Sequence, residues 1–311
     1  MTTSEAFKEM LHGPVVAITT PFNADLSLDV DAVGDLVEFY CQSKIGPLIV
    51  GGGTGEFYSM TMDERKMLIK TAVETATGRL PIIAGCSHSG THLALELIQH
   101  ARDVGADGAM ITPPYYAFTG FEGLYRHFEI LTTECDLGIM IYFSFQVRKK
   151  VQFITDDMSL MARLYELPHL VGLKDSTGDL RFLHNVTCTL GDRVAIVASQ
   201  GQYGFLAVAE LGCNSFVTGY GNVWPEKELR FWQAMRQGDR KSAIELYHKW
   251  ERPYLDHLMQ YGVEYYWAGV KALQEMVGLP GGPMRPPLLD WPREKLPALK
   301  AEMIRIGLME Q

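Results

Sequence analysis

Short apolar segments alternate with longer amphipathic segments through the first two-thirds of the chain. Each apolar segment has about the length of a strand that is buried on both faces, and most are rich in Ile, Val and Leu. Between them, residues such as Val33, Leu36 and Tyr40 recur with the spacing of one helix face. The apolar segments are Val15–Thr20, Pro47–Val50, Pro81–Ala84, Gly108–Thr112, Gly138–Tyr142, Leu170–Leu173, Val194–Ala198 and Ser215–Thr218.

This alternation predicts right-handed βαβ units and therefore an all-parallel sheet. Eight such units in about 240 residues fit a closed (β/α)8 barrel better than an open doubly wound sheet, which remains the alternative. We therefore expect a barrel domain over residues 1–224 and a helical subdomain over residues 225–311.

The pattern of the last part of the chain predicts helices with no strand between them. The expected helices are Glu228–Met235, Arg240–Trp250, Tyr265–Val277 and Pro297–Leu308. The glycine- and proline-rich stretch Gly278–Pro287 interrupts them, because no regular element continues through such a sequence. The aromatic residues of this part suit either its own core or a subunit interface. They are Trp250, Tyr254, Tyr261, Tyr265, Tyr266 and Trp267.

Composition and charge narrow the class of protein. The chain has 28 Lys and Arg against 37 Asp and Glu, and this formal charge of −9 disfavours binding to a nucleic-acid backbone. No apolar stretch reaches the roughly 18–20 residues that cross a bilayer, and the first residues lack a signal-peptide core. The five cysteines are scattered and never spaced as CxxC, which favours free thiols. We expect a cytoplasmic protein without a nucleic-acid or membrane partner.

Lys174 is the first candidate for chemistry. Active sites of parallel barrels lie at the carboxyl ends of the strands, and Lys174 directly continues the sixth apolar segment. Burial near the barrel axis disfavours the charged amine, and a neutral amine attacks carbonyl groups and can form a Schiff base. A lysine that merely pairs with a neighbouring carboxylate is the competing interpretation; Asp175 is adjacent but should point the other way.

Two other strand ends could complete such a site. Tyr142 ends the fifth segment, beside the strand of Lys174, where a phenol could relay protons or simply belong to the core. The second segment runs into Gly51–Phe57, and glycine N–H groups with the Thr54 hydroxyl could hold a carboxylate. A plain tight turn is equally compatible with that loop. Together, the three neighbourhoods predict a site for a 2-keto acid.

The residues also resemble those of a known family, the dihydrodipicolinate synthase / N-acetylneuraminate lyase superfamily, over nearly the whole chain. Members are class I Schiff-base lyases on a (β/α)8 barrel with a C-terminal helical domain, and they need no cofactor. The matching motifs are Pro21-Phe22, Gly53–Glu56, Pro114–Tyr116, Glu122–Tyr125, Tyr142, Gly172–Asp179, Asn222 and Gly282–Pro287.

The resemblance implies a role for individual residues. Lys174 would form the imine and Tyr142 would move the proton. Gly53 and Thr54 would hold the substrate carboxylate, and Ser199 and the main chain of Val217 would face the substrate. Tyr116 would reach into the site of a neighbouring subunit, which implies a dimer or a tetramer built of two dimers.

Departures from the family pattern bear on the substrate. Amino-acid-making synthases usually carry two threonines in the glycine loop, and Gly53 replaces the first. They also place an arginine five residues after the tyrosine, where this chain has Val147, and Arg148 falls one place later. The sequence motif Gly52–Phe57 resembles instead that of the 5-dehydro-4-deoxyglucarate dehydratases. Those enzymes usually carry Asn-Arg-Asn directly after the catalytic tyrosine, where this chain has Phe143–Phe145. We therefore expect a hydroxylated, acidic sugar-acid substrate, with Arg148 pairing a distal carboxylate.

Two other classes of protein stay open at this point. His88 and His92 are spaced as a pair of metal ligands, but Gly90 lies between them and no carboxylate follows at ligand spacing, so we expect no metal. A barrel retained only to bind keto acids is the non-enzymatic alternative, because a fold does not fix a function.

Overall fold

The structure, a computed structural model, describes residues 2–310 and contains a closed barrel of eight parallel strands in the order β1 to β8. This confirms the predicted barrel and excludes the open sheet. The strands are β1 Gly13–Ala17, β2 Leu48–Val50, β3 Ile82–Gly85, β4 Gly108–Ile111, β5 Ile139–Phe143, β6 Leu170–Asp175, β7 Ala195–Ala198 and β8 Ser215–Thr218. Each overlaps the apolar segment that predicted it.

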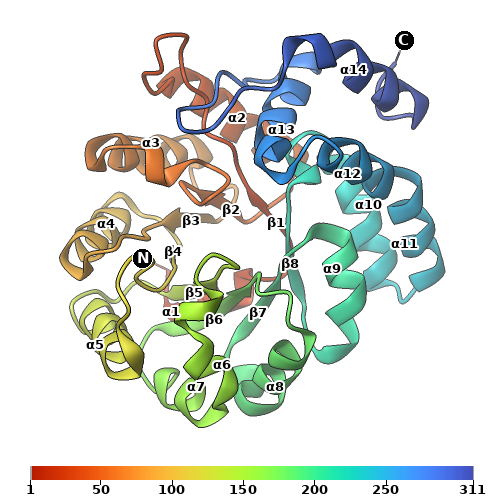
Figure 1. The fold of residues 1–311 in the computed structure, drawn as a ribbon. Coiled ribbons are helices and arrows are strands. Elements are labelled where there is room, and N and C mark those ends of the chain that lie inside the picture. The colour runs from red at the N-terminus through yellow and green to blue at the C-terminus, as the bar shows by residue number, and fades with distance from the viewer. Residues whose placement is uncertain (1, 311) are drawn as a thin grey trace.

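Helices surround the ring of strands (Figure 1). Those that follow β1 to β7 are α2 Val30–Ser43, α3 Met62–Ala76, α4 Thr91–Val104, α5 Gly120–Thr133, α6 Gln152–Asp156, α7 Met158–Leu164, α8 Leu180–Leu190 and α9 Gly201–Val208. Local sequence sets their ends. The Thr61 hydroxyl and the Glu64 carboxylate cap the start of α3 reciprocally, and Gly105 ends α4 in the left-handed conformation.

A short first helix, α1 Ser4–Met10, closes the bottom of the barrel. Phe7 is fully buried and belongs to the apolar cluster inside the barrel, with Val15, Ile83 and Val197. A Cβ added at Gly108 would lie 2.3 Å from the Phe7 ring, so this ring fills the space between strand starts. The sequence pattern did not predict α1.

The last part of the chain is helical, as expected. Its helices are α10 Pro225–Arg236, α11 Arg240–Leu246, α12 Arg252–Met259, α13 Tyr266–Met276 and α14 Leu296–Arg305, with a π-helical turn over Tyr247–Glu251 between α11 and α12. Helix α12 was not predicted. Pro253 lies in its first turn, where proline needs no N–H partner. The stretch after α13 has no regular structure through Arg285, in agreement with the predicted break.

The C-terminal helices have their own core, in which Trp250 and Tyr254 are buried and the other aromatic residues pack against them. This core also takes in Tyr220 and Trp224 from the loop after β8. Helix α10 packs on β1 and α2. Figure 1 shows α13 beside α2, where Gln274 donates a hydrogen bond to the Tyr40 hydroxyl. The division of the chain at residue 224 stays a prediction.

Candidate active site

Lys174 and Tyr142 lie side by side on β6 and β5, near the carboxyl ends of these strands. The Lys174 side chain is 7% exposed, and its Nζ lies 3.9 Å from the centre of the Tyr142 ring. On the other side, Lys174 pairs with Val197, a member of the apolar cluster inside the barrel. An amine so placed is shielded from bulk water, and the adjacent phenol can exchange a proton with a molecule bound to it.

Two serines extend this pair towards β7. The Ser176 hydroxyl donates to the Tyr142 hydroxyl at 3.4 Å and lies 2.5 Å from the Oγ of Ser199, which follows β7. Sequence reasoning selected Ser199 and missed Ser176. Side chains two residues apart on a strand point to the same face, so the two-residue spacing from Lys174 could have identified it.

The glycine loop after β2 presents free backbone donors at the same end of the barrel. Among the hydrogen bonds of residues 2–310, none uses the N–H groups of Gly53 or Thr54, while the Thr20 hydroxyl donates to the Gly55 carbonyl at 2.7 Å. Thr54 is buried, and a Cβ built on Gly53 would meet nothing within 4 Å. The loop therefore offers donors suited to a carboxylate, with open space where a larger side chain would stand.

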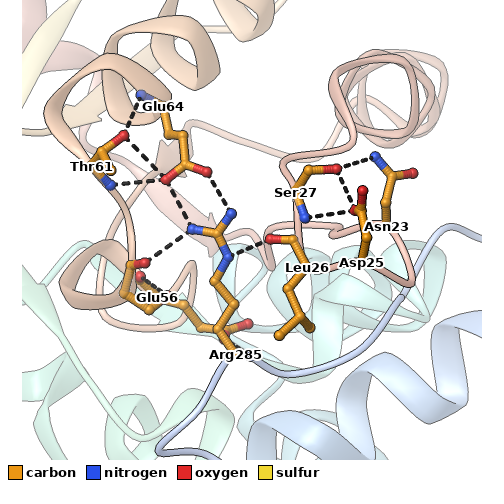
Figure 2. A network of polar contacts seen from close by, with 9 residues as sticks. Asn23, Asp25, Leu26, Ser27, Glu56, Thr61, Glu64 and Arg285 are labelled. Atoms are coloured by element: carbon orange, nitrogen blue, oxygen red, sulfur yellow. Dashed lines mark hydrogen bonds and ion pairs between the residues drawn. The ribbon is translucent and has the colours of Figure 1, made fainter.

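A buried ion pair anchors this loop to the C-terminal helices. Glu56 has a left-handed backbone (φ 58°), and its Oε1 accepts from the Lys271 ammonium at 2.6 Å. Its other oxygen accepts from the backbone N–H of Arg285 at 3.0 Å. Figure 2 shows the Arg285 guanidinium between Glu64 and the carbonyl of Leu26. The sequence placed Glu56 and Arg285 in two separate motifs and did not predict that they meet.

Arg148 lies at the rim of the site. Its guanidinium donates to the Thr177 carbonyl at 3.2 Å and to the Asp179 carboxylate at 3.4 Å, and the side chain is 53% exposed. Nearby, burial raises the pKa of Asp175 to about 6, partly opposed by the hydrogen bonds that Thr177 donates. A cleft of about 40 Å³ opens here between the ends of β6 and β7.

Val217 and Tyr116 occupy different surroundings. Val217, on β8, is half-buried and packs beside the apolar cluster inside the barrel. Tyr116, after β4, is 86% exposed, and Phe118 nearby is 84% exposed. The Lys150 ammonium donates to the Tyr116 carbonyl and lies 4.3 Å from the Phe118 ring centre. Within one chain, the Tyr116 side chain therefore points to the surface rather than into the barrel.

Other features lie away from these residues. The ring nitrogen Nδ1 of His88 accepts from the Gly90 N–H at 3.1 Å, and residues 2–310 contain no group of three or more His, Cys, Asp or Glu side chains arranged to bind a metal. A larger cleft of about 250 Å³, near Lys8, His12 and Asp192, lies at the amino ends of β7 and β8. Because active sites of such barrels lie at the carboxyl ends of the strands, the residues around Lys174 remain the candidate site despite this larger cleft. No helix in the described part of the chain is long and apolar enough to cross a membrane.

Comparisons with known proteins show which sequences and structures the chain resembles. Residues 10–305 match the model of the dihydrodipicolinate synthetase family. A probable 5-dehydro-4-deoxyglucarate dehydratase of Methylobacterium radiotolerans is 32% identical over 295 residues, which cover 93% of each chain. The 4-hydroxy-tetrahydrodipicolinate synthase of Aquifex aeolicus is 32% identical over 77% of this chain and 80% of its own length. A crystal structure of dihydrodipicolinate synthase from Aquifex aeolicus superposes with a TM-score of 0.83 at 28% identity, covering 96% of this chain and 100% of that one.

Proposed function

The chain belongs to the dihydrodipicolinate synthetase family and is a lyase, and on that premise we propose that it forms a Schiff base between Lys174 and a 2-keto acid. The observation that carries the proposal is the buried Lys174 amine, 3.9 Å from the centre of the Tyr142 ring. The amine attacks the keto carbon, and loss of water leaves the imine. Tyr142 then moves a proton between the adjacent carbon and the leaving group.

The carboxylate of the keto acid binds at the glycine loop in this proposal. The unused N–H groups of Gly53 and Thr54 are the donors, and the Thr54 hydroxyl supplies a third. Ser199 and the main chain of Val217 contact the rest of the substrate. The protonated imine withdraws electrons from the adjacent carbon. In a dehydration, that carbon loses a proton and the resulting enamine expels a hydroxyl group as water. In an aldol cleavage, the hydroxyl group on the next carbon loses its proton and the bond between the two carbons breaks, which leaves an aldehyde and the enamine.

We infer that the substrate is a deoxy keto sugar acid such as 5-dehydro-4-deoxyglucarate, which is dehydrated, with or without decarboxylation, or cleaved as in an aldolase. The open space at Gly53 supports a substrate bulkier than pyruvate at the loop. Relatives named as probable 5-dehydro-4-deoxyglucarate dehydratases align over 93% and 97% of this chain. Arg148 has N–H groups beyond the two that it uses on Thr177 and Asp179, and these would pair a distal carboxylate.

The second candidate is condensation of pyruvate with an aldehyde, as in 4-hydroxy-tetrahydrodipicolinate synthases. Two relatives with that name, 32% and 34% identical, favour it. The absent hydroxyl at Gly53 and the apolar Val147 at the position of the expected arginine weigh against it.

We also propose that two chains pair so that Tyr116 of one enters the site of the other. The 86% exposure of Tyr116 and the neighbouring exposed Phe118 support such an interface. All five cysteines are free, which supports a reducing compartment such as the cytoplasm.

Reductive trapping tests the chemistry. Borohydride with pyruvate or 5-dehydro-4-deoxyglucarate should leave an adduct on Lys174 that mass spectrometry locates, and Lys174→Ala should lose the adduct and all turnover. The matched control is Lys149→Ala, which removes an exposed lysine from the turn after β5 and should keep both.

The products identify the reaction. Turnover with release of carbon dioxide and a semialdehyde indicates a dehydratase, release of pyruvate an aldolase, and consumption of pyruvate a synthase. An adduct without turnover of any keto acid would favour the binding protein, and an unmodified Lys174 would refute the proposal.

A further inference from the structure

Two buried glutamates accept hydrogen bonds from the same residue where the C-terminal helices contact the barrel. Glu228 of α10 and Glu251 of the π-helical turn are 0% and 2% exposed. Gln202 joins them, because its side-chain amide donates to Glu228 at 3.1 Å and its backbone N–H donates to Glu251 at 2.9 Å. We call Glu228 and Glu251 the acid pair.

The acid pair has no cationic partner in the described part of the chain. No Lys, Arg or His side chain of residues 2–310 lies within 4.0 Å of either carboxylate. The nearest basic residues in the chain serve other groups: Arg252 faces Asp256, and Lys227 and Lys249 lie over the Trp250 ring.

Phenols and further acids surround the pair on its other sides. Tyr220 comes from the loop after β8, Tyr254 from α12 and Tyr266 from α13, and burial raises the pKa of each phenol, so all three stay neutral. Glu226, near Tyr220, adds negative rather than positive charge. Tyr203 and Tyr247 are the remaining titratable neighbours, from α9 and the π-helical turn.

Burying two charged carboxylates without a counter-ion strongly destabilises a folded protein. One shared proton removes most of that penalty. Burial raises the pKa of Glu228 to about 7 and that of Glu251 well above 4.5, the latter also because of the charge of Glu228. Gln202 Oε1 and the Tyr220 hydroxyl are buried with no hydrogen-bond partner, so an acceptor for the carboxylic O–H is close at hand.

The acid pair is connected to both neighbouring strand ends of the site. Gln200 and Gly201 form a left-handed turn directly after Ser199, and a Cβ on Gly201 would lie 2.2 Å from Glu251 Oε1. The Glu251 carboxylate thus lies against the backbone of the turn that presents Ser199. On the other side, the hydroxyl of Thr218, the residue after Val217, donates to Glu228 at 2.5 Å.

We propose that Glu228 and Glu251 are positioning residues, which share one proton and thereby fix the Ser199–Gly201 turn and the end of β8, so that the C-terminal helices set substrate affinity. Loss of the proton leaves two like charges behind the turn. The turn then loosens, and Ser199 no longer holds its place 2.5 Å from Ser176. The affinity part of this inference rests on the proposed function, whereas the loosening of the turn does not.

The direction of the pH effect follows from the raised pKa values. Both carboxyl groups keep protons that the unfolded chain releases above about pH 4.5. The stability of the folded protein therefore falls as the pH rises, first through about 7, where Glu228 ionises, and further as Glu251 loses the remaining proton. Glu251→Gln keeps an acceptor for the Gln202 N–H and removes the second charge. Glu245→Gln, an exposed site in α11, is the matched control.

Hydrogen exchange gives a test without substrate. Between pH 6.5 and 8.5, a peptide covering residues 196–208 should lose protection about tenfold in the wild type, beyond the intrinsic rise in exchange rate, but not in Glu251→Gln. Equal loss in both proteins would overturn the shared proton. If Glu251→Gln does not fold, Glu228→Gln provides the same comparison. A bound cation would also overturn the shared proton. In that case the melting temperature would rise with sodium, potassium or calcium but not with tetramethylammonium, and only when both glutamates are present.

Steady-state kinetics tests the positioning role. The ratio of wild-type KM to Glu251→Gln KM should rise about tenfold over the same pH range. The corresponding ratio of kcat values should stay within about twofold, and so should the ratio of wild-type KM to Glu245→Gln KM. Taking this ratio cancels the pH effects that the two proteins share. A constant ratio despite altered exchange would reduce the acid pair to a structural role. If no keto-acid adduct forms on the protein, the proposed function is refuted. The shared proton is not refuted by that result, because the hydrogen-exchange experiment tests it without substrate.

Discussion

The C-terminal helices hold the barrel at two places that differ in charge. After β2, Glu56 pairs with Lys271. Glu64 pairs with Arg285, as Figure 2 shows, so both of these acids have a cationic partner. Beside β7 and β8, Glu228 and Glu251 both accept hydrogen bonds from Gln202 and have no cationic partner among residues 2–310. We call the first the ion-paired contact and keep the name acid pair for the second.

The difference shows that one fold can position two site loops by opposite electrostatic means. The ion-paired contact neutralises its charges within the chain, and it persists until acid protonates a carboxylate. The acid pair needs a proton from solvent, and base removes it. The ion-paired contact is therefore sensitive to low pH and the acid pair to high pH.

We expect the largest loss of stability from a substitution that breaks the ion-paired contact. Lys271→Met leaves the Glu56 carboxylate buried without its cation and should lower the free energy of unfolding by ~3–5 kcal/mol. Denaturant unfolding at pH 7 measures this loss. Lys70→Met, at a half-exposed lysine whose pair with Glu74 spans 3.8 Å, should cost less than ~1 kcal/mol. A similar cost for both variants would mean that the buried pair is not essential.

We expect a smaller change in stability from the titration of the acid pair. Wild-type stability should fall by ~1–3 kcal/mol between pH 5 and 8, because the pKa of Glu228 is raised to about 7 by burial. Glu228→Gln cannot lose a proton, so its unfolding free energy should change less over this range. Denaturation curves at each pH compare the two proteins. Parallel curves would show that Glu228 is not the group that titrates.

The smallest effect concerns the Glu64 side of the ion-paired contact. Hydrogen bonds from Arg285 lower the pKa of Glu64 to about 2, so the stabilisation is complete above about pH 4.5 and is lost as the pH falls through 2. Partial exposure to solvent limits it to ~1 kcal/mol. Glu64→Gln keeps the cap of α3, and thermal melts between pH 5 and 2.5 should show a shallower decline for it than for the wild type. An equally steep decline would exclude Glu64 as the source.

The barrel was predictable from the sequence because its signal is local and repeated. Each strand is an apolar run such as Ser215–Thr218, whose observed bounds equal the predicted ones. Helices α1 and α12 were missed for a local reason as well, since helices of only 7 and 8 residues show little periodicity.

The candidate site was predictable only in part. Lys174 and Tyr142 follow from strand ends, and the structure places them on neighbouring strands. The contacts of Glu56 with Lys271, 215 residues apart in the chain, and of Gln202 with Glu251 depend on how helices pack, which no local pattern encodes. The assigned roles of the site residues remain predictions.

The closed floor of the barrel affects the sequence of events in a catalytic cycle. Because Phe7 fills the space between the strand starts, we expect ligands to enter and leave the barrel at the carboxyl ends of the strands, where Lys174 and the glycine loop lie. A molecule attached at depth must leave after whatever entered on top of it. A reaction that yields two fragments here would therefore release them in a fixed order, the outer fragment first and the lysine-bound fragment last.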